Sequence, residues 1–222
     1  MKSSADKVLA ILWKDILSEL RTRDIIVSVL VFALLVIVIF NFAFDPARVR
    51  LVAAGVLWVA LTFAGVLGLN RSFVLEKDKG CLEGLMLCPV SREVIYLGKL
   101  LGNLLFMLIV AVIVLPIFFA LFNLPIFNPE LILIVVLATT GFASVGTLFS
   151  ALAVNTKARD IMLPILFFPI VAPVIIAAVK STGLVLDGEP WSSWASWLQI
   201  MIAFDVIFMV VSSLVFEFII EE

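Results

Sequence analysis

The chain has 222 residues, of which 64% are hydrophobic and 14% are charged, and its mean hydropathy is +1.27. Soluble domains are roughly half apolar and a quarter charged, so this composition excludes an ordinary soluble domain and indicates an integral membrane protein. The net charge of −2 gives no sign of nucleic-acid binding. The length accommodates about six membrane spans of ~20 residues, which we assign to one domain, residues 1–222.

Residues 1–23 have the spacing of an amphipathic helix. Charges spread through this segment argue against a signal peptide. We expect the helix to lie in the membrane interface, with its apolar face toward the acyl chains. The alternative is a soluble helix that packs on a partner. The predicted apolar face comprises Leu9, Leu12, Trp13, Ile16, Leu17 and Leu20.

Six apolar runs predict six transmembrane helices, so the expected fold is all-α. Of the 15 lysines and arginines, all except Arg48, Arg50 and Lys180 fall on one side of the membrane when the spans alternate. The positive-inside rule then places both termini in the cytoplasm. The predicted spans are Ile25–Phe44, Leu51–Leu69, Leu100–Phe122, Leu131–Ala153, Ile161–Val179 and Gln199–Ile220.

Residues 71–99 form a charged segment between the second and third predicted spans. Within it Leu82, Leu85 and Met86 fall at i, i+3 and i+4, which predicts a short amphipathic helix on the cytoplasmic membrane surface. Ser91 is a good N-cap for the following helix. The segment is either a docking element, which its length favours, or a solvated connection. The predicted docking surface comprises Glu76, Lys77, Lys79, Gly80, Leu82, Glu83, Leu85, Met86 and Pro89.

Residues 180–198 are expected to form a loop on the outer, periplasmic side. Trp191, Trp194 and Trp197 are spaced by three, so they share one face of a short helix that begins after Pro190. This face is either part of an aromatic belt at the membrane surface or a platform for a flat aromatic ligand or a partner.

Asp205 lies roughly 9 Å into the last predicted span. A carboxylate at that depth needs a partner or a water-filled cavity. Lys180 is the only cation that the predicted topology places near it. A structural ion pair and a role in a transport pathway both remain open. Small and hydroxyl residues in the fourth span, by contrast, are typical of helix–helix contacts.

The sequence contains few of the residues and motifs that form enzyme active sites. The chain has no histidine, which excludes histidine-based triads and HExxH zinc sites. Cys81 and Cys88 lack CxxC spacing, so neither a disulfide nor a metal site is indicated. The Gly98-Lys99 step lacks the rest of a phosphate-binding loop. We therefore predict no catalytic residue, metal ligand or cofactor-binding residue in this chain.

Three stretches carry a resemblance to a known family. The order of elements is similar to that of ABC-2 type exporter permeases. More specifically, the chain resembles the cytochrome c maturation protein B family of haem exporter permeases. The resemblance covers essentially the whole chain and is strongest in EKDKGCLEGL and PVSR. The stretches are GVLWVALTFAGVLGLNRSF, LNRSFVLEKDKGCLEGLMLCPVSREVIYLGK and AFDVIFMVVSSLVFEFIIEE.

The resemblance implies a subunit that works with partners in the bacterial inner membrane. Residues 71–99 would hold the coupling helix seated on a cytoplasmic ABC ATPase subunit, which binds ATP-Mg. A haem-handling membrane protein, a small membrane subunit and a periplasmic haem chaperone would complete the pathway, and a second copy of the chain is a further candidate partner. Haem would be the transported or transferred ligand. The alternatives are an ABC-2 permease for a lipid or drug and a non-ABC membrane scaffold or channel.

Overall fold

The structure, a computed structural model, describes residues 4–21, 23–78, 84, 90–124, 128–154 and 159–219. In these residues the regular secondary structure is helical throughout, and six helices contain a segment long and apolar enough to span a membrane. This confirms the predicted all-α fold with six spans and a preceding amphipathic helix. The helices are α1 (Ser4–Arg21), α2 (Arg23–Ala43), α3 (Pro46–Asp78), α5 (Arg92–Phe122), α6 (Pro129–Val154), α7 (Arg159–Leu186) and α8 (Trp191–Ile219).

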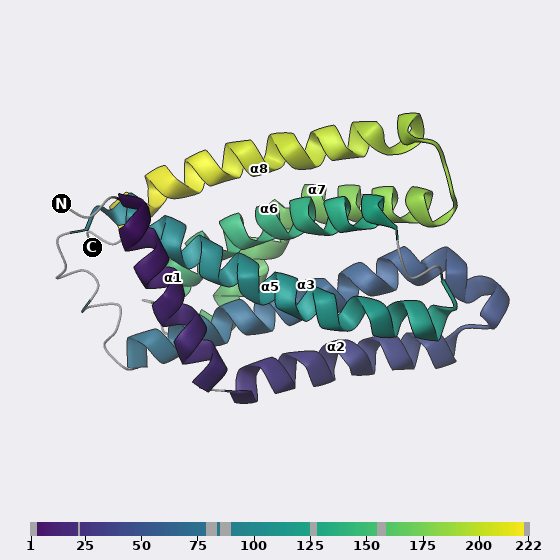
Figure 1. Ribbon diagram of the computed structural model, residues 1–222, viewed down its shortest axis with the longest axis horizontal. Helices are drawn as coiled ribbons and strands as arrows, with labels where there is room; N and C mark the ends of the chain where they lie inside the picture. Colours follow the sequence, from purple (N-terminus) through teal and green to yellow (C-terminus); the bar gives the residue numbers. More distant parts are fainter. Residues whose placement is uncertain are drawn as a thin grey trace.

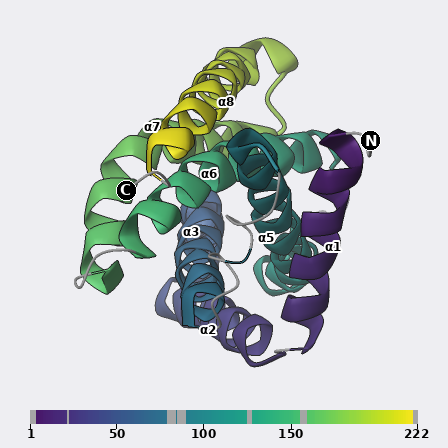
Figure 2. The same cartoon turned by 90° about the vertical axis from the view of Figure 1, so that its left-hand side faces the viewer.

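The six long helices lie side by side, and α1 runs across one end of the bundle (Figure 1). We call this the near end, where α1 begins and α8 ends, and the opposite end the far end. Seen from the near end, α1 lies along α5 (Figure 2). Helix α6 contacts α3, α5, α7 and α8, so it occupies the centre of the bundle.

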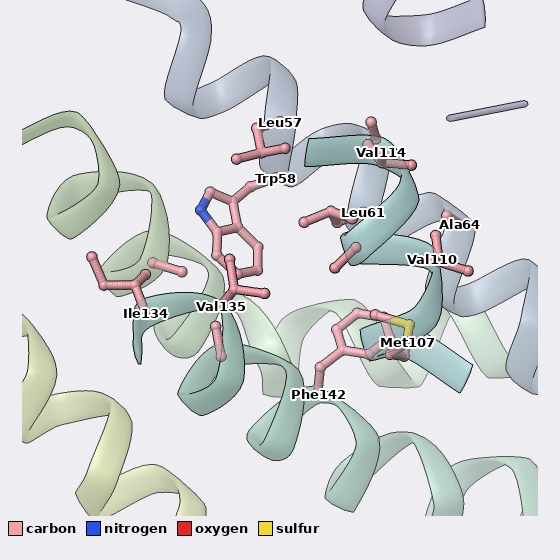
Figure 3. Close-up of a cluster of buried hydrophobic side chains, with 14 of the residues drawn as sticks. Leu57, Trp58, Leu61, Ala64, Met107, Val110, Val114, Ile134, Val135 and Phe142 are labelled. Atoms are coloured by element: carbon pink, nitrogen blue, oxygen red, sulfur yellow. The ribbon is translucent and has the colours of Figure 1, made fainter. Parts of the chain in front are cut away.

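Apolar side chains of α3, α5 and α6 meet in the middle of the bundle. Leu61 of α3, Met107 of α5 and Phe142 of α6 point toward one another (Figure 3). The helices approach closely here because Gly65 has no side chain: a Cβ at that position would lie 2.6 Å from Met107 Sδ. Close approach at small residues is the main source of packing energy between helices that are surrounded by lipid.

The helices of the second and third spans extend into the predicted charged segment 71–99. Helix α3 continues to Asp78 and α5 already begins at Arg92, so both ends of the predicted loop 71–99 are helical. Ser91 is the N-cap of α5, as predicted, but through its backbone: its carbonyl oxygen accepts hydrogen bonds from the Val94 and Ile95 N–H groups at 3.1 and 3.3 Å. Its side chain makes no capping hydrogen bond.

The predicted outer loop 180–198 is also mostly helical. Helix α7 extends to Leu186 because the polar groups after Lys180 find partners inside the bundle. The Ser181 hydroxyl donates to the Ala177 carbonyl at 2.8 Å. Thr182 Oγ1 accepts a hydrogen bond of 2.9 Å from the Trp58 indole.

Helix α8 begins at Trp191, directly after Pro190, and runs without a break to Ile219. The Ser193 N–H donates to the Pro190 carbonyl at 2.9 Å and so extends the first turn back to the proline. The tryptophan segment therefore belongs to the start of the last membrane helix. A separate short helix followed by a span at Gln199 was the wrong expectation.

Candidate functional site

The first turns of α5 carry a polar face that lies inside the bundle. Tyr96, Lys99 and Asn103 are spaced i, i+3 and i+7, and their exposed fractions are 0%, 2% and 7%. Residues at this spacing share one side of a helix. This face begins seven residues after Pro89, the last residue of the predicted docking surface. We call these three residues the α5 polar face.

Lys99 is paired with Asp15 of α1. Its Nζ donates to the two carboxylate oxygens at 3.2 and 3.1 Å. Asp15 also lies 3.0 Å from the Lys14 ammonium. A buried ammonium group is tolerated only with a partner that compensates for lost hydration. The sequence analysis assigned Lys99 to the cytoplasmic segment 71–99 and did not identify its partner, which is 84 positions away in the chain.

Helix α1 crosses α5 at two glycines. A Cβ at Gly98 would lie 2.7 Å from Ile11 Cγ2, and a Cβ at Gly102 would lie 3.3 Å from Asp15 Oδ2. Small residues spaced by four allow two helices to approach closely. Helix α1 therefore packs on the Gly98–Gly102 pair, which we call the α1 seat. Asp15 adds the ion pair with Lys99.

Three residues of the predicted apolar face of α1 are turned away from the protein, whereas Leu12 and Ile16 are half-buried. Leu9, Trp13 and Leu17 are 59%, 63% and 49% exposed. The helix therefore packs on its own chain through Ile11 and Asp15 and offers its apolar side to the surroundings. Its position in the membrane interface stays a prediction.

The other two residues of the α5 polar face bond to α6. Tyr96 and Ser144 share a hydrogen bond of 2.9 Å between their hydroxyl groups, and Asn103 Nδ2 donates to Thr147 Oγ1 at 2.9 Å. Thr147 in turn donates to the Ala143 carbonyl at 2.7 Å. These hydrogen bonds lie among apolar side chains, where an unmade bond is expensive.

The ring of Phe216 from α8 packs against Tyr96, with ring centroids 5.4 Å apart. Together these contacts tie the start of α5 to α1, α6 and α8. Among the described residues, no group of three or more His, Cys, Asp or Glu side chains could hold a metal ion.

Most of the predicted docking surface lies outside the described residues. Glu76 and Lys77 lie in the last turn of α3, which brings the chain out at the near end. This is the end at which α1 crosses α5. The positions outside the described residues are Lys79, Gly80, Leu82, Glu83, Leu85, Met86 and Pro89.

Asp205 is buried against α6. Its side chain is 7% exposed and contacts the backbone of α6 at Gly141, where even a methyl group would collide with Oδ1. Neither carboxyl oxygen has a hydrogen-bond partner among the described residues. The ion pair with Lys180, one of the two alternatives left open by the sequence, does not form, because Lys180 lies on the side of α7 that faces α2 and α3.

The three tryptophans at the start of α8 do not form one exposed platform. Trp194 is fully buried, whereas Trp191 is 57% exposed. Their rings are in edge-to-face contact with centroids 4.3 Å apart. Trp197 is partly buried against the core. Of the predicted surface, Trp191 is the part that remains freely accessible.

A family model and the similar proteins of known name point to the same family. The model of the family described as "CcmB protein" matches residues 6–221. The chain belongs to the CcmB family. It is 30% identical to "Heme exporter protein B" of Pseudomonas aeruginosa over 177 residues, which are 78% of this chain and 79% of that protein. It is 25% identical to the protein of the same name from Bradyrhizobium diazoefficiens over 205 residues, 91% of each chain. The α5 polar face, the α1 seat and Asp205 all lie within the region matched to CcmB.

Proposed function

We propose that this CcmB-family chain is the transmembrane permease subunit of an ABC-type haem export system in c-type cytochrome maturation. The observation that carries the proposal is the match over residues 6–221, because it includes the predicted docking segment together with all six spans. An ABC-2 permease for another substrate and a non-ABC scaffold are not favoured by relatives that bear the name heme exporter protein B.

In this proposal, ATP hydrolysis takes place on a separate cytoplasmic ABC ATPase, with Mg-bound ATP. The ATPase would press on the surface formed by residues 76–89. The α5 polar face would pass the movement on, because Lys99 connects α5 to α1, and Tyr96 and Asn103 connect it to α6. Both termini and the docking segment would face the cytoplasm, with the protein in the inner membrane.

The remaining partners are proposed from the family. A haem-handling membrane protein, a small membrane subunit and a periplasmic haem chaperone would receive or release haem, and a second copy of the chain is a further candidate. The exposed Trp191 would lie on the periplasmic side, where such a partner could contact it. This chain would serve as the mechanical subunit of the complex.

Deleting the gene and complementing it in the same strain tests this function. We expect deletion to abolish haem-stained c-type cytochromes and a tagged copy to restore them and to co-purify with an ATPase. Asn103→Leu removes the bond to Thr147, so maturation should fall while the ATPase still co-purifies. The matched control is Asn41→Leu, since exposed Asn41 bonds to the Leu121 carbonyl at the far end. Normal cytochromes in the deletion strain would overturn the proposal.

We further propose that haem iron is ligated by partners and not by this chain. The strong axial ligands in proteins are His, Cys thiolate, Met and Tyr. Histidine is absent from the sequence, and the single tyrosine, Tyr96, is fully buried in the α5 polar face. Haem titrated into the detergent-solubilised chain should give no stoichiometric low-spin absorption spectrum. Such a spectrum, lost on mutating one residue of this chain, would show that the chain is itself a haem-ligating subunit.

A further inference from the structure

A pocket of about 460 Å³ opens at the far end of the bundle, between α2, α3 and α7. It falls within the size range of small-molecule sites, roughly 300–1,000 Å³. One wall is formed by Phe40 and Phe44, whose rings are stacked with centroids 6.1 Å apart. The pocket lies apart from the α5 polar face and from Asp205, neither of which lines it.

Two glycines keep this pocket open. A Cβ at Gly55 of α3 would meet no atom within 4 Å, and a Cβ at Gly183 of α7 would touch only the Ala54 Cβ at 3.9 Å. Glycine in a helix interior costs about 0.5–1 kcal/mol relative to alanine. Alanine would fit at either position, so the glycines here are not required by close packing of the helices.

The mouth of the pocket is apolar and exposed. Leu51 is 84% exposed, Val59 40% and Phe44 37%. All three belong to membrane-spanning helices or to the short turn between them, so the mouth faces the bilayer. A molecule that enters here comes from the lipid phase.

Two opposite charges line the same pocket. Lys180 and Asp187 are spaced i and i+7 on the α7 side, and both are exposed. Within the part of the chain that the structure describes, neither side chain has a hydrogen bond or an ion pair. Two helical turns, about 10 Å, separate their backbones along the axis, with Asp187 nearer the end of the bundle.

The order of groups along the pocket matches one kind of amphiphile. On the α7 side, Lys180 lies about two helical turns further from the far end than Asp187, and apolar side chains of α2 and α3 line the pocket opposite them. We propose that the pocket binds a phospholipid with an ammonium head group, such as phosphatidylethanolamine. One acyl chain lies along Phe40 and Val59, Lys180 pairs with the phosphate, and Asp187 pairs with the ammonium group.

The charges discriminate against related molecules. A phosphatidylglycerol head group has no cation for Asp187, so among the described side chains that line the pocket its phosphate gains only the contact with Lys180. A porphyrin with two propionates would bring a second anion close to Asp187, and like charges at a partly desolvated contact are unfavourable. The site thus selects a zwitterionic lipid over both anionic amphiphiles.

Native mass spectrometry of the full-length, detergent-solubilised chain tests the site. The probes are phosphatidylethanolamine and phosphatidylglycerol with identical acyl chains, and haem. We expect phosphatidylethanolamine to bind most tightly with one molecule per chain. Gly55→Leu should abolish binding of both lipids by filling the pocket, and Gly55→Ala should weaken it. A thermal melt in the same detergent reports whether each variant is folded.

The charge variants keep the test decisive even if Gly55→Leu fails to fold. Asp187→Asn should lower the affinity for phosphatidylethanolamine about tenfold, because one hydrogen bond between charged groups is lost. The affinity for phosphatidylglycerol should stay unchanged. Lys180→Gln should weaken both lipids. Glu189→Gln is the matched control, since Glu189 lies two residues away and bonds to Ser193. Equal affinity for the two lipids, stronger binding of haem, or an unaltered affinity in Asp187→Asn would each overturn the proposal.

Discussion

At the scale of single residues, two charged side chains are buried in the bundle under different conditions. Lys99 meets the Asp15 carboxylate at 3.1 Å, whereas Asp205 has no hydrogen-bond partner in the described residues. Removing one member of a buried ion pair is strongly destabilising, but replacing an uncompensated polar group by an apolar one of similar shape is neutral or stabilising. The two sites therefore predict opposite responses to substitution.

Substitutions in the Lys99–Asp15 pair should be asymmetric. Asp15→Asn leaves the buried ammonium without its anion and should destabilise the protein by about 3 kcal/mol. Lys99→Met should cost less, because methionine suits the apolar surroundings and Asp15 keeps its contact with Lys14. The double variant should be more stable than Asp15→Asn alone. Thermal unfolding in detergent measures all three, and additive effects would contradict the coupling.

Asp205→Leu should raise the midpoint of thermal unfolding in detergent by about 2–4 °C. A shift of this size corresponds to ~1 kcal/mol in the free energy of unfolding for a chain of this length. Leucine has a similar branched shape and removes two oxygens that have no partner in the described residues. Gly141→Ala is the companion variant and should lower the midpoint, because its methyl group would collide with Asp205. A lower midpoint for Asp205→Leu would show that the carboxyl group has a partner in the intact protein.

At the scale of elements, α5 is the helix that follows the predicted docking segment along the chain. Its first turns contact α1 through Gly98 and Lys99 and α6 through Tyr96 and Asn103. The helix is consequently held on two sides within three turns of its N-terminus. In the proposed function, these contacts are the ones through which a movement of the residues before Ser91 would reach α1 and α6.

Glu83→Arg should separate ATPase association from membrane insertion. The substitution presents a cation in place of an anion on the predicted docking surface, and a like-charge or mismatched contact can cost several kcal/mol. We expect loss of the co-purifying ATPase and of cytochrome c maturation at an unchanged level of membrane-inserted protein. Glu130→Arg, at an exposed position at the start of α6 at the far end, is the control. Full activity of Glu83→Arg would mean that Glu83 is simply solvated.

The sequence predicted the middle of each span well and the ends less well. Apolar runs are long enough to define a membrane helix without knowledge of its neighbours. The polar residues at the ends depend on distant partners: Lys99 needs Asp15, and Thr182 needs Trp58, which is 124 positions away. The α5 polar face could have been predicted from the sequence, because polar residues follow the Ser91 cap at i, i+3 and i+7 spacing.

At the scale of the whole molecule, charge asymmetry and architecture agree. The start of α1 and the end of α8 lie at the near end, and six membrane-spanning helices lie between them (Figure 1). An even number of spans returns the chain to the side from which it started. The positive-inside rule, applied to the sequence, predicts that this side is the cytoplasmic one.

The topology can be tested with single cysteines after Cys81 and Cys88 have been replaced by serine. Cysteines at residues 46, 126 and 188 should react with an impermeant thiol reagent applied from the periplasm, because these positions lie in or beside the far-side connections. Cysteines at 80 and 157 should react only after the membrane is permeabilised, which also serves as the control for their reactivity. Labelling of 80 and 157 in intact cells would place the docking segment on the wrong side for an ATPase. In that case, the coupling role of the α5 polar face would fail together with the topology.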